Sequence, residues 1–354
     1  YEKLSADKTA LGILLEYSAE AQEQDVSSVV LQSGNSTNPS KVVLGCVGAG
    51  NYAARTLIPA FRQASARLHT LVSAGGVSGA VEGNKAGFEI TSTDVANVLA
   101  SDVINSIVIA TRHDTHADLV VDSLKAVKHV FVEKPLCLNL EDLGRVEKMY
   151  EECNQLLMVG FNRRFAPHVV KIKQLLKSSP EPHSFVMTVN AGAIANDHWT
   201  QDKELGGGRL IGEACHFVDL LRFLADSTIT AFDLTEMASE NDDTATISLK
   251  FDNGSIGTVH YFANGNKGFP KERLEIFSGG KILQLDNFKK LKGYGWAGFK
   301  SMNLMRQDKG QNACVKAFVH AIEEGKLSPI PFGEIVEVSR VCIELVSRKS
   351  HGEV

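Results

Sequence analysis

The segment 206–219, GGGRLIGEACHFVD, holds the residues best suited to acid–base chemistry. Its triple glycine opens a helical pattern that carries Glu213 and His216, which are three residues apart and therefore share a helix face. A neutral histidine can remove the proton of an alcohol while hydride leaves the same carbon, and a neighbouring carboxylate can orient the ring. The segment favours an oxidoreductase site; taken alone, it fits a hydrogen-bonded core histidine equally well.

A second group, VEKP at 132–135, ends an apolar strand. The carboxyl edges of parallel sheets are where such folds bind ligands. We expect Glu133 to accept hydrogen bonds from ribose hydroxyls and Lys134 to donate to a substrate oxygen. A cis bond before Pro135 would direct the lysine into the cleft. The alternative is an ordinary charged turn closed by a proline.

The segment 110–116, ATRHDTH, likewise leaves a buried strand for a helix. Its position predicts that Thr111, His113 and His116 lie near a cofactor. Asp114 or Thr115 is expected to cap the helix, and a catalytic role for His113 is less favoured than a structural one.

Two further groups suggest contacts to substrate. Asn162, Arg163 and Arg164 follow the last strand of the first domain, where arginines can clamp an anionic substrate; an interdomain salt bridge is an equal alternative. His198 and Trp199 lie in a loop before the triple glycine, where the indole can stack on a sugar ring, although a plain exposed loop fits as well.

The element that must position these groups is the strand–turn–helix unit at 41–63. The apolar strand 41–47 runs into a Gly-x-Gly-x-x-Ala turn and a helical pattern, which predicts a dinucleotide site. Glycines permit the turn and bring backbone amides close to a pyrophosphate, and the helix N-terminus favours negative charge. The residues assigned to the cofactor in this turn are Gly48, Gly50, Asn51, Tyr52 and Ala53.

The next strand, 68–73, ends at Ser73 with neither an acid for the ribose nor an arginine for a 2′-phosphate. This strand end therefore determines the cofactor choice poorly; Ser73 is assigned to the cofactor, which we expect to be NAD, with NADP possible. Further strands are predicted at 103–110, 127–132 and 156–160. The spacing of apolar residues between them predicts helices at 92–100, 115–126 and 139–154. This alternation predicts an α/β fold, a doubly wound parallel Rossmann sheet over 41–160.

The pattern changes in the second domain, 161–354. Alternating apolar and polar residues predict strands at 184–193, 229–237, 244–251, 254–262, 273–277 and 281–285, and helices at 207–224, 311–324 and 333–348. We expect a large, open, mostly antiparallel sheet that covers substrate or meets another subunit.

The composition argues against a nucleic-acid-binding or membrane-bound protein. A net charge of −5 gives no basic excess for nucleic acid or an anionic membrane, and no apolar run reaches membrane-spanning length. Six scattered cysteines without a C-x-x-C pair predict reduced, buried thiols, no metal site and a cytoplasmic location. Residues 18–40 are rich in Ser, Gln, Asn and Gly and are expected to form a linker.

Together the motifs GAGNYA, ATRHDTH, VEKPL, GFNRRF and GGGRLIGEACHFVD resemble the Gfo/Idh/MocA oxidoreductases in order and spacing. The resemblance implies NAD(P)-dependent oxidation or reduction of a hydroxyl on a sugar, cyclitol or nucleotide-sugar, and a homodimer or homotetramer formed through the open sheet. It implies Lys134 as the substrate-contacting lysine, Glu133 as a cofactor contact and His216 as the general acid/base. The family often has Asp where this chain has Gly212, and Glu213 is the candidate substitute.

The tail 1–17 resembles the end of a medium-chain, zinc-type alcohol dehydrogenase domain. With the GEACHF form of the histidine motif, it implies the back part of a bi-domain oxidoreductase, a type associated with bacterial surface-polysaccharide synthesis. A dehydrogenase is the first hypothesis. A redox-neutral lyase, hydrolase or epimerase with tightly bound NAD uses the same residues, and a cofactor-binding protein without activity is the third.

Overall fold

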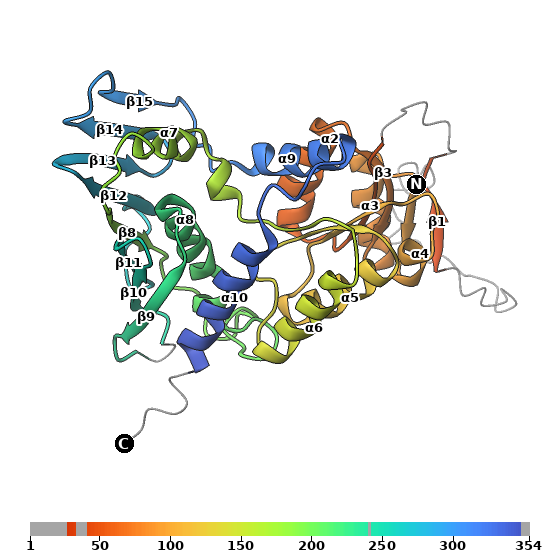
Figure 1. Ribbon diagram of the computed structural model, residues 1–354. Coiled ribbons are helices and arrows are strands. Elements are labelled where there is room, and N and C mark those ends of the chain that lie inside the picture. Colours follow the sequence, from red (N-terminus) through yellow and green to blue (C-terminus); the bar gives the residue numbers. More distant parts are fainter. Residues whose placement is uncertain (1–26, 33–40, 240–241, 348–354) are drawn as a thin grey trace, which may run out of the picture.

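The computed structural model describes residues 27–32, 41–239 and 242–347. These residues form two lobes, each built on one β-sheet, with helices between and around the sheets (Figure 1). The expected tail 1–17 lies outside the described residues, as do 18–26 and 33–40 of the expected linker.

The first lobe is a doubly wound sheet in the order β1-β4-β3-β2-β5-β6-β7. Its strands are β1 (Ser28–Val30), β2 (Val43–Val47), β3 (Arg67–Val72), β4 (Ile90–Ser92), β5 (Ser106–Ile109), β6 (His129–Val132) and β7 (Leu157–Val159). All neighbours from β4 to β7 are parallel. Every residue of β2, β5 and β7 is buried, because layers of helices cover both faces of the sheet. The predicted Rossmann architecture is confirmed.

Helices from distant parts of the chain cover this sheet. On one side lie α2 (Ile58–Gln63), preceded by the π-helical turn η1 (Ala53–Leu57), and α9 (Gln311–Glu323); on the other lie α5 (His116–Lys125) and α6 (Leu140–Glu151) (Figure 1). Phe318 of α9 packs edge-on against Phe131 of β6, with ring centroids 5.5 Å apart. Helix α9 belongs to the range 161–354 assigned to the second domain, yet it completes the core of the first.

The edge of the first sheet differs from the sequence-based expectation. Strand β1 lies inside the expected linker and pairs antiparallel with β4, with Val29 opposite Thr91. The expected helix 92–100 is reduced to α4 (Ala96–Leu99), and α3 (Gly76–Ala86) was not expected. β1 and β4 have three residues each and lack a long apolar run, so these two edge strands depend on pairing with their neighbours.

The second lobe is a sheet in the order β15-β14-β13-β12-β8-β11-β10-β9. Its strands are β8 (Ser184–Asn190), β9 (Ile229–Glu236), β10 (Ala245–Phe251), β11 (Ile256–Phe262), β12 (Glu272–Ser278), β13 (Lys281–Asp286), β14 (Lys290–Tyr294) and β15 (Ser301–Asn303). The β8–β11 pair is parallel and the others are antiparallel. The large, mostly antiparallel sheet is therefore confirmed, and β14 and β15 extend it beyond the expected strands.

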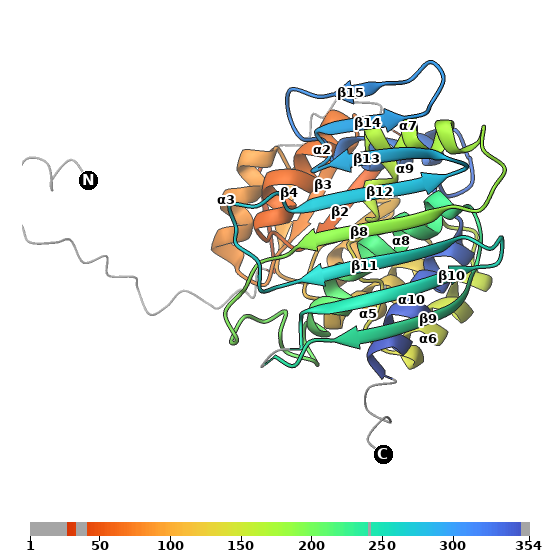
Figure 2. The ribbon, with the colours of Figure 1, turned by 90° about the vertical axis from the view of Figure 1, so that its left-hand side faces the viewer.

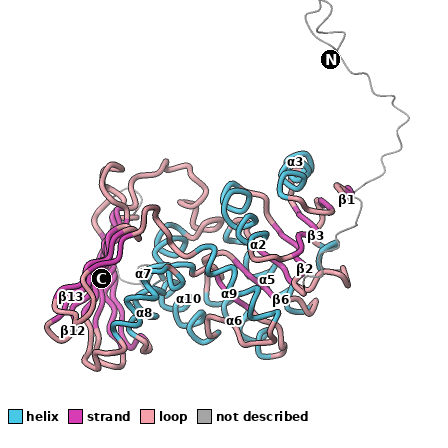
Figure 3. The backbone as a smooth tube through the Cα atoms, turned by 90° about the horizontal axis from the view of Figure 1, so that it is seen from above, coloured by secondary structure: helices cyan, strands magenta, loops and turns pink. Residues whose placement is uncertain are grey.

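Helices cover one face of this second sheet. They are α7 (Pro167–Leu176), α8 (Cys215–Ala225) and α10 (Phe332–Ser347), which lie between the two sheets (Figure 3). Among the described residues no helix covers the opposite face, which is turned to the viewer in Figure 2. The alternation of buried and accessible residues along β12 follows from this one-sided cover.

The six cysteines are free, and all except Cys153 are buried. Burial raises the pKa of Cys46 and of Cys215 to about 12, so these thiols stay protonated near neutral pH. In the part of the chain that the structure describes, no helix is both long and apolar enough to cross a membrane. Within the same ranges, no group of three or more His, Cys, Asp or Glu side chains is placed to hold a metal ion.

Candidate active site

A cavity of about 1470 Å³ lies where the carboxyl ends of β2, β5 and β6 face residues of the second lobe. A site for one small ligand usually measures about 300–1,000 Å³, so this cavity has room for a dinucleotide and a second molecule. The sequence-predicted residues that line it are Gly48, Gly50, Asn51, Tyr52, Ala53, Ser73, Thr111, His113, His116, Glu133, Lys134, Asn162, Arg163, His198, Trp199, Glu213 and His216. Arg164 is not among the lining residues.

The glycine turn after β2 forms one wall. Gly48 has φ +107°, and a Cβ built on it would lie 2.3 Å from the carbonyl oxygen of Ala110. Only glycine fits this contact between the ends of β2 and β5. A Cβ on Gly50 would meet no atom within 4 Å, so the backbone there faces open space. This open glycine turn suits the close approach of a pyrophosphate.

At the end of β3, Ser73 lines the cavity together with Ala74 and Thr93. None of these side chains carries a charge. The structure thus places no acid or arginine from the tip of β3 against the cavity, in keeping with the open choice between NAD and NADP.

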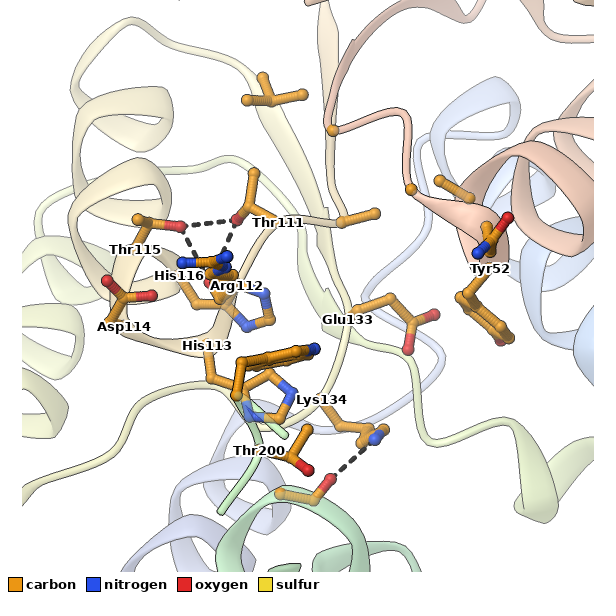
Figure 4. A pocket seen from close by; sticks show the side chains of 18 of the residues that line it. Tyr52, Thr111, Arg112, His113, Asp114, Thr115, His116, Glu133, Lys134 and Thr200 are labelled. Atoms are coloured by element: carbon orange, nitrogen blue, oxygen red, sulfur yellow. Dashed lines mark hydrogen bonds between the residues drawn. The ribbon is translucent and has the colours of Figure 1, made fainter. Parts of the chain in front are cut away.

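The loop after β5 is held by its own side chains (Figure 4). The hydroxyls of Thr111 and Thr115 are 2.7 Å apart, and the Thr115 hydroxyl donates to the carbonyl of Arg112 at 2.9 Å. Thr115 precedes α5 but its side chain does not cap the helix, contrary to expectation. His116 is fully buried, and its Nδ1 donates to the carbonyl of Pro135 at 2.7 Å, which ties this loop to the one after β6.

His113 connects the first lobe to the triple-glycine segment. Its Nδ1 donates to the carbonyl oxygen of Gly206 at 2.8 Å, and its ring packs edge-on against Trp199 with centroids 4.7 Å apart. Burial lowers the pKa of His113 to about 3, so the ring is neutral at pH 7. These contacts give His113 a structural role, as the sequence favoured, while its ring also lines the cavity.

Lys134 reaches across to the second lobe. Its Nζ donates to the carbonyl oxygen of Gly212 at 2.7 Å (Figure 4). The Lys134–Pro135 peptide bond is cis, as expected. The ammonium group is thus held by a backbone carbonyl, and its remaining donors are available to a ligand.

Glu133 lies at the centre of the cavity wall and faces Tyr52 (Figure 4). Burial raises the pKa of Glu133 to about 7, although Lys134 and Arg163 favour the charged form. The carboxyl group therefore exists in both protonation states near neutral pH and can accept hydrogen bonds from ribose hydroxyls in either.

His216 is buried at the start of α8, with its ring edge-on to Phe161 at a centroid distance of 6.1 Å. Burial lowers its pKa well below 6.5, and the charges of Arg163 and Lys134 act in the same direction. The imidazole is therefore neutral at pH 7. Its Nδ1 is buried without a hydrogen-bond partner among the described residues, which leaves Nε2 as the nitrogen available to the cavity.

Glu213 does not orient His216, so this expectation was wrong. Its carboxylate accepts hydrogen bonds from Lys271 Nζ at 2.6 Å and from the Tyr261 hydroxyl at 2.5 Å. Arg209 lies 3.3 Å away. Burial opposes ionisation, but Lys271 and Tyr261 lower the pKa of Glu213 to about 2. Two cations and a hydroxyl from the second lobe attract the carboxylate more strongly than a neutral imidazole can.

The two arginines of the GFNRRF motif are both paired with acids. Arg163 lines the cavity and makes a bidentate contact to Glu272 at 2.9 Å for each bond. Arg164 binds the fully buried Asp219 and also Glu334. Arg164 therefore joins η3 (Asn162–Phe165) to α8 and α10, and its assignment as a substrate contact was wrong. Arg164 does form salt bridges, but Asp219 and Glu334 lie in the same range, 161–354, as Arg164 itself, so the pairs are not the interdomain bridge of the alternative.

Several cavity residues had no motif to reveal them. Lys271 precedes β12 and Lys309 precedes α9, both in loops far along the chain from the other site residues. Arg209 stands inside the GGGR motif, four residues before Glu213 on the same helix face, but its other partner, Asp243, lies outside the motif and could not be read from it. The sequence shows that these residues are cationic, but it does not show that they line the cavity.

Two family models match the chain. Residues 42–161 match the model described as "Oxidoreductase family, NAD-binding Rossmann fold". Residues 171–280 match the model described as "GFO/IDH/MocA C-terminal domain". The matched ranges coincide with the first sheet and with most of the second.

Curated relatives are distant. The chain is 27% identical over 215 residues to myo-inositol 2-dehydrogenase of Thermotoga maritima, covering 57% of this chain and 63% of that protein. It is 24% identical over 299 residues to inositol 2-dehydrogenase of Rhizobium meliloti, covering 80% of this chain and 89% of that protein. The first match thus spans about six tenths of the Thermotoga enzyme.

Solved structures share the whole architecture. Levoglucosan dehydrogenase in complex with NADH and levoglucosan superposes with a TM-score of 0.80 at 19% identity, covering 88% of this chain and 98% of that chain. An oxidoreductase domain protein from Kribbella flavida gives a TM-score of 0.79 at 21% identity, covering 88% and 98%. At these identities the likeness concerns the fold.

Proposed function

Because this chain belongs to the Gfo/Idh/MocA family of oxidoreductases, with its NAD-binding Rossmann domain, we propose that it transfers hydride between NAD and a hydroxyl or keto carbon of a sugar-like substrate. The observation that carries the proposal is the position of Lys134 and His216. They come from different lobes and line one cavity beside the open glycine turn. The names of the inositol dehydrogenase relatives support a polyhydroxylated substrate.

The residues present fit the dinucleotide. The open space at Gly50, the close contact at Gly48 and the position of Glu133 form a cradle along the ends of β2, β5 and β6. The nicotinamide ring, when bound, supplies the hydride acceptor. The other residues that we assign to the cofactor are Asn51, Tyr52, Ala53, Ser73, Thr111, His113, His116 and Lys134, all of which line the cavity.

In this mechanism, Lys134 Nζ donates a hydrogen bond to the substrate oxygen and stabilises the negative charge that develops on it. The carbonyl of Gly212 holds the ammonium in place. The lowered pKa of His216 keeps the ring neutral at pH 7. In the tautomer that carries its proton on Nδ1, Nε2 is free to accept the hydroxyl proton. In the reductive direction the same nitrogen returns the proton.

Narrower parts of the proposal concern substrate, assembly and context. We propose a homodimer or homotetramer formed through the uncovered face of the second sheet, which exposes Ile256, Phe262 and Phe277. From the resemblance of the motifs we also propose a nucleotide-sugar substrate, a role in surface-polysaccharide synthesis and an upstream dehydrogenase-like domain.

The test begins with the purified protein and its cofactor. Mass spectrometry of nucleotide released by denaturation identifies what co-purifies, and titration with NADH and NADPH gives both dissociation constants. A panel of cyclitols, sugars and nucleotide sugars is then followed by absorbance at 340 nm, the band of reduced nicotinamide. We expect oxidation of at least one member of the panel.

The variants His216→Ala and Lys134→Met are expected to lower kcat by about 10²–10⁴-fold while NADH binding is kept. His320→Ala, on the exposed side of α9, is the matched control. Full activity in His216→Ala contradicts the mechanism. Product formation without a net change at 340 nm shows the redox-neutral alternative instead, and failure to bind either nucleotide excludes the enzyme hypothesis.

A further inference from the structure

Cationic side chains outnumber carboxylates around His216. The five cations that line this part of the cavity are Lys134, Arg163, Arg209, Lys271 and Lys309. The three carboxylates paired with them are Glu213, Asp243 and Glu272. Two positive charges are left without a matching carboxylate. Glu133, with a pKa of about 7, offsets at most one of them.

The other charged residues of the cavity do not supply the missing negative charge. Asp114 and Arg112 line the side formed by the loop before α5, where their charges offset each other. Asp118 also lines the cavity, and it pairs with Arg145 at 2.7 Å. The excess of positive charge therefore lies on the side of the second lobe.

Each lysine of the second lobe shares its carboxylate with an arginine. Lys309 Nζ contacts Glu272 at 2.6 Å, and the same carboxylate receives both bonds from Arg163. Lys271 Nζ contacts Glu213 at 2.6 Å, beside Arg209. An ammonium group has three donors, so both lysines keep donors for a ligand after these contacts.

Like charges held together in a partly buried cavity repel one another, and the repulsion is larger than in water because solvent screens it less. The same cations lie around His216: burial is the main reason that its pKa is lowered, and the charges of Arg163, Lys134, Lys309 and Lys271 act in the same direction. An anion on the ligand would remove this repulsion and gain charge-assisted hydrogen bonds.

We propose that the substrate carries an anionic group, a carboxylate or a phosphate, and that Lys271 and Lys309 bind it next to the carbon that is oxidised. This inference rests on the proposed function and specifies one further property of the substrate, its negative charge. Neither lysine lies on the strands that hold the glycine turn, so we assign them to substrate rather than to the cofactor pyrophosphate.

The experiment measures binding to the NADH-loaded protein by calorimetry. D-glucose, D-glucuronate and D-glucose 6-phosphate form one series, so that the carboxylate and phosphate sources are separated against a neutral sugar. UDP-N-acetylglucosamine and its uronate form another, in which both members carry the nucleotide diphosphate and only the uronate adds an anion on the sugar ring. In at least one series the member with the anion on its sugar is expected to bind about tenfold or more tightly than the member whose sugar is neutral, as for a charge-assisted hydrogen bond. Equal or weaker binding of the anionic members in every series, or no binding by any of them, overturns the proposal.

Lys271→Met and Lys309→Met locate the subsite. Glu213 keeps Arg209 and Tyr261, and Glu272 keeps Arg163, so neither variant leaves a buried carboxylate alone. Each is expected to lose the preference for the anion while binding of the neutral member stays unchanged. Lys290→Met, on the exposed part of β14, is the matched control.

The dissociation constant for NADH separates two explanations. It is expected to stay unchanged in both variants, and an equal loss of NADH affinity assigns the lysines to the cofactor and overturns the proposal. Binding of an anionic sugar without any turnover supports the subsite while contradicting the proposed dehydrogenase, so the two proposals fail in different ways.

Discussion

The ring of His113 occupies the space that a side chain on Gly212 would need. A Cβ built on Gly212 would lie 2.9 Å from Cε1 and 3.2 Å from Nδ1 of His113. The ring cannot move aside easily, because Gly206 and Trp199 hold it. The carboxylate that the family resemblance led us to expect at this position would clash with this ring, and the backbone carbonyl of Gly212 contacts Lys134 instead.

The substitution Gly212→Asp is therefore expected to destabilise the protein by about 1–3 kcal/mol through overpacking. Replacing His113 by Ala in the same chain frees the space, so the double variant is expected to be more stable than the two single changes predict by addition. Urea unfolding measures both free energies. Gly144→Asp is the control, because it lies exposed in α6 and a Cβ there meets no atom within 4 Å. A Gly212→Asp protein as stable as the parent would show that His113 moves freely.

The two glycines of the turn after β2 are expected to respond differently to alanine. Gly48→Ala places a Cβ 2.3 Å from the Ala110 carbonyl at a φ of +107°, so it should destabilise the fold itself. Gly50→Ala meets no neighbouring atom and should leave the free energy of unfolding almost unchanged. It should still weaken NADH binding by about tenfold or more, because the methyl group stands where backbone amides approach the phosphates. Unfolding curves and NADH titration test both, and unchanged NADH affinity in Gly50→Ala would move the pyrophosphate elsewhere.

Removing the cation from the buried pair of Arg164 and Asp219 is expected to cost about 3–5 kcal/mol of folding free energy. Arg164→Met leaves Asp219, which is 0% exposed, without its cation. The KM for substrate should not change, because Arg164 does not line the cavity. Arg145→Gln breaks an exposed ion pair and serves as the control, with little expected effect. A raised KM in a stable Arg164→Met protein would return this arginine to the substrate site.

The pH dependence of kcat/KM for alcohol oxidation tests the state of His216. A general base must be unprotonated, and a pKa lowered well below 6.5 keeps it so as the pH falls from 8 through 6.5. An unperturbed imidazole would place the acid limb of the profile at about pH 6.5. Because the pKa of His216 is lowered, we expect the limb well below that pH. Replacing Lys271 and Lys309 by Met removes two of the charges that lower this pKa, so the limb should move to higher pH in that double variant. Glu133 also titrates near neutral pH, with a pKa of about 7. A limb centred at 6.5 that persists in a Glu133→Gln protein would therefore argue against His216 as the base.

The elements with local signals could be predicted from the amino-acid sequence alone. Continuous apolar runs gave the buried parallel strands, and the glycine turn after β2 marked the dinucleotide cradle. Lys134 and the cofactor-side residues follow from the same logic, because the carboxyl ends of neighbouring parallel strands meet at one edge of a sheet. The motif 206–219 likewise brought His216 to the cavity.

Which charged side chains pair with one another depends on the packing of segments that lie far apart in the chain. Glu213 and His216 share a local spacing, but Lys271 and Tyr261, 58 and 48 residues away, take the carboxylate. Arg164 carries the same charge as its neighbour Arg163, yet its partner Asp219, 55 residues away, removes it from the cavity. Coulomb energy depends on distance in space and on burial. Neither the distance in space nor the burial of a charge follows from the separation of residues along the chain. The ion pairs and the positive field around His216 could therefore be identified only in the folded structure.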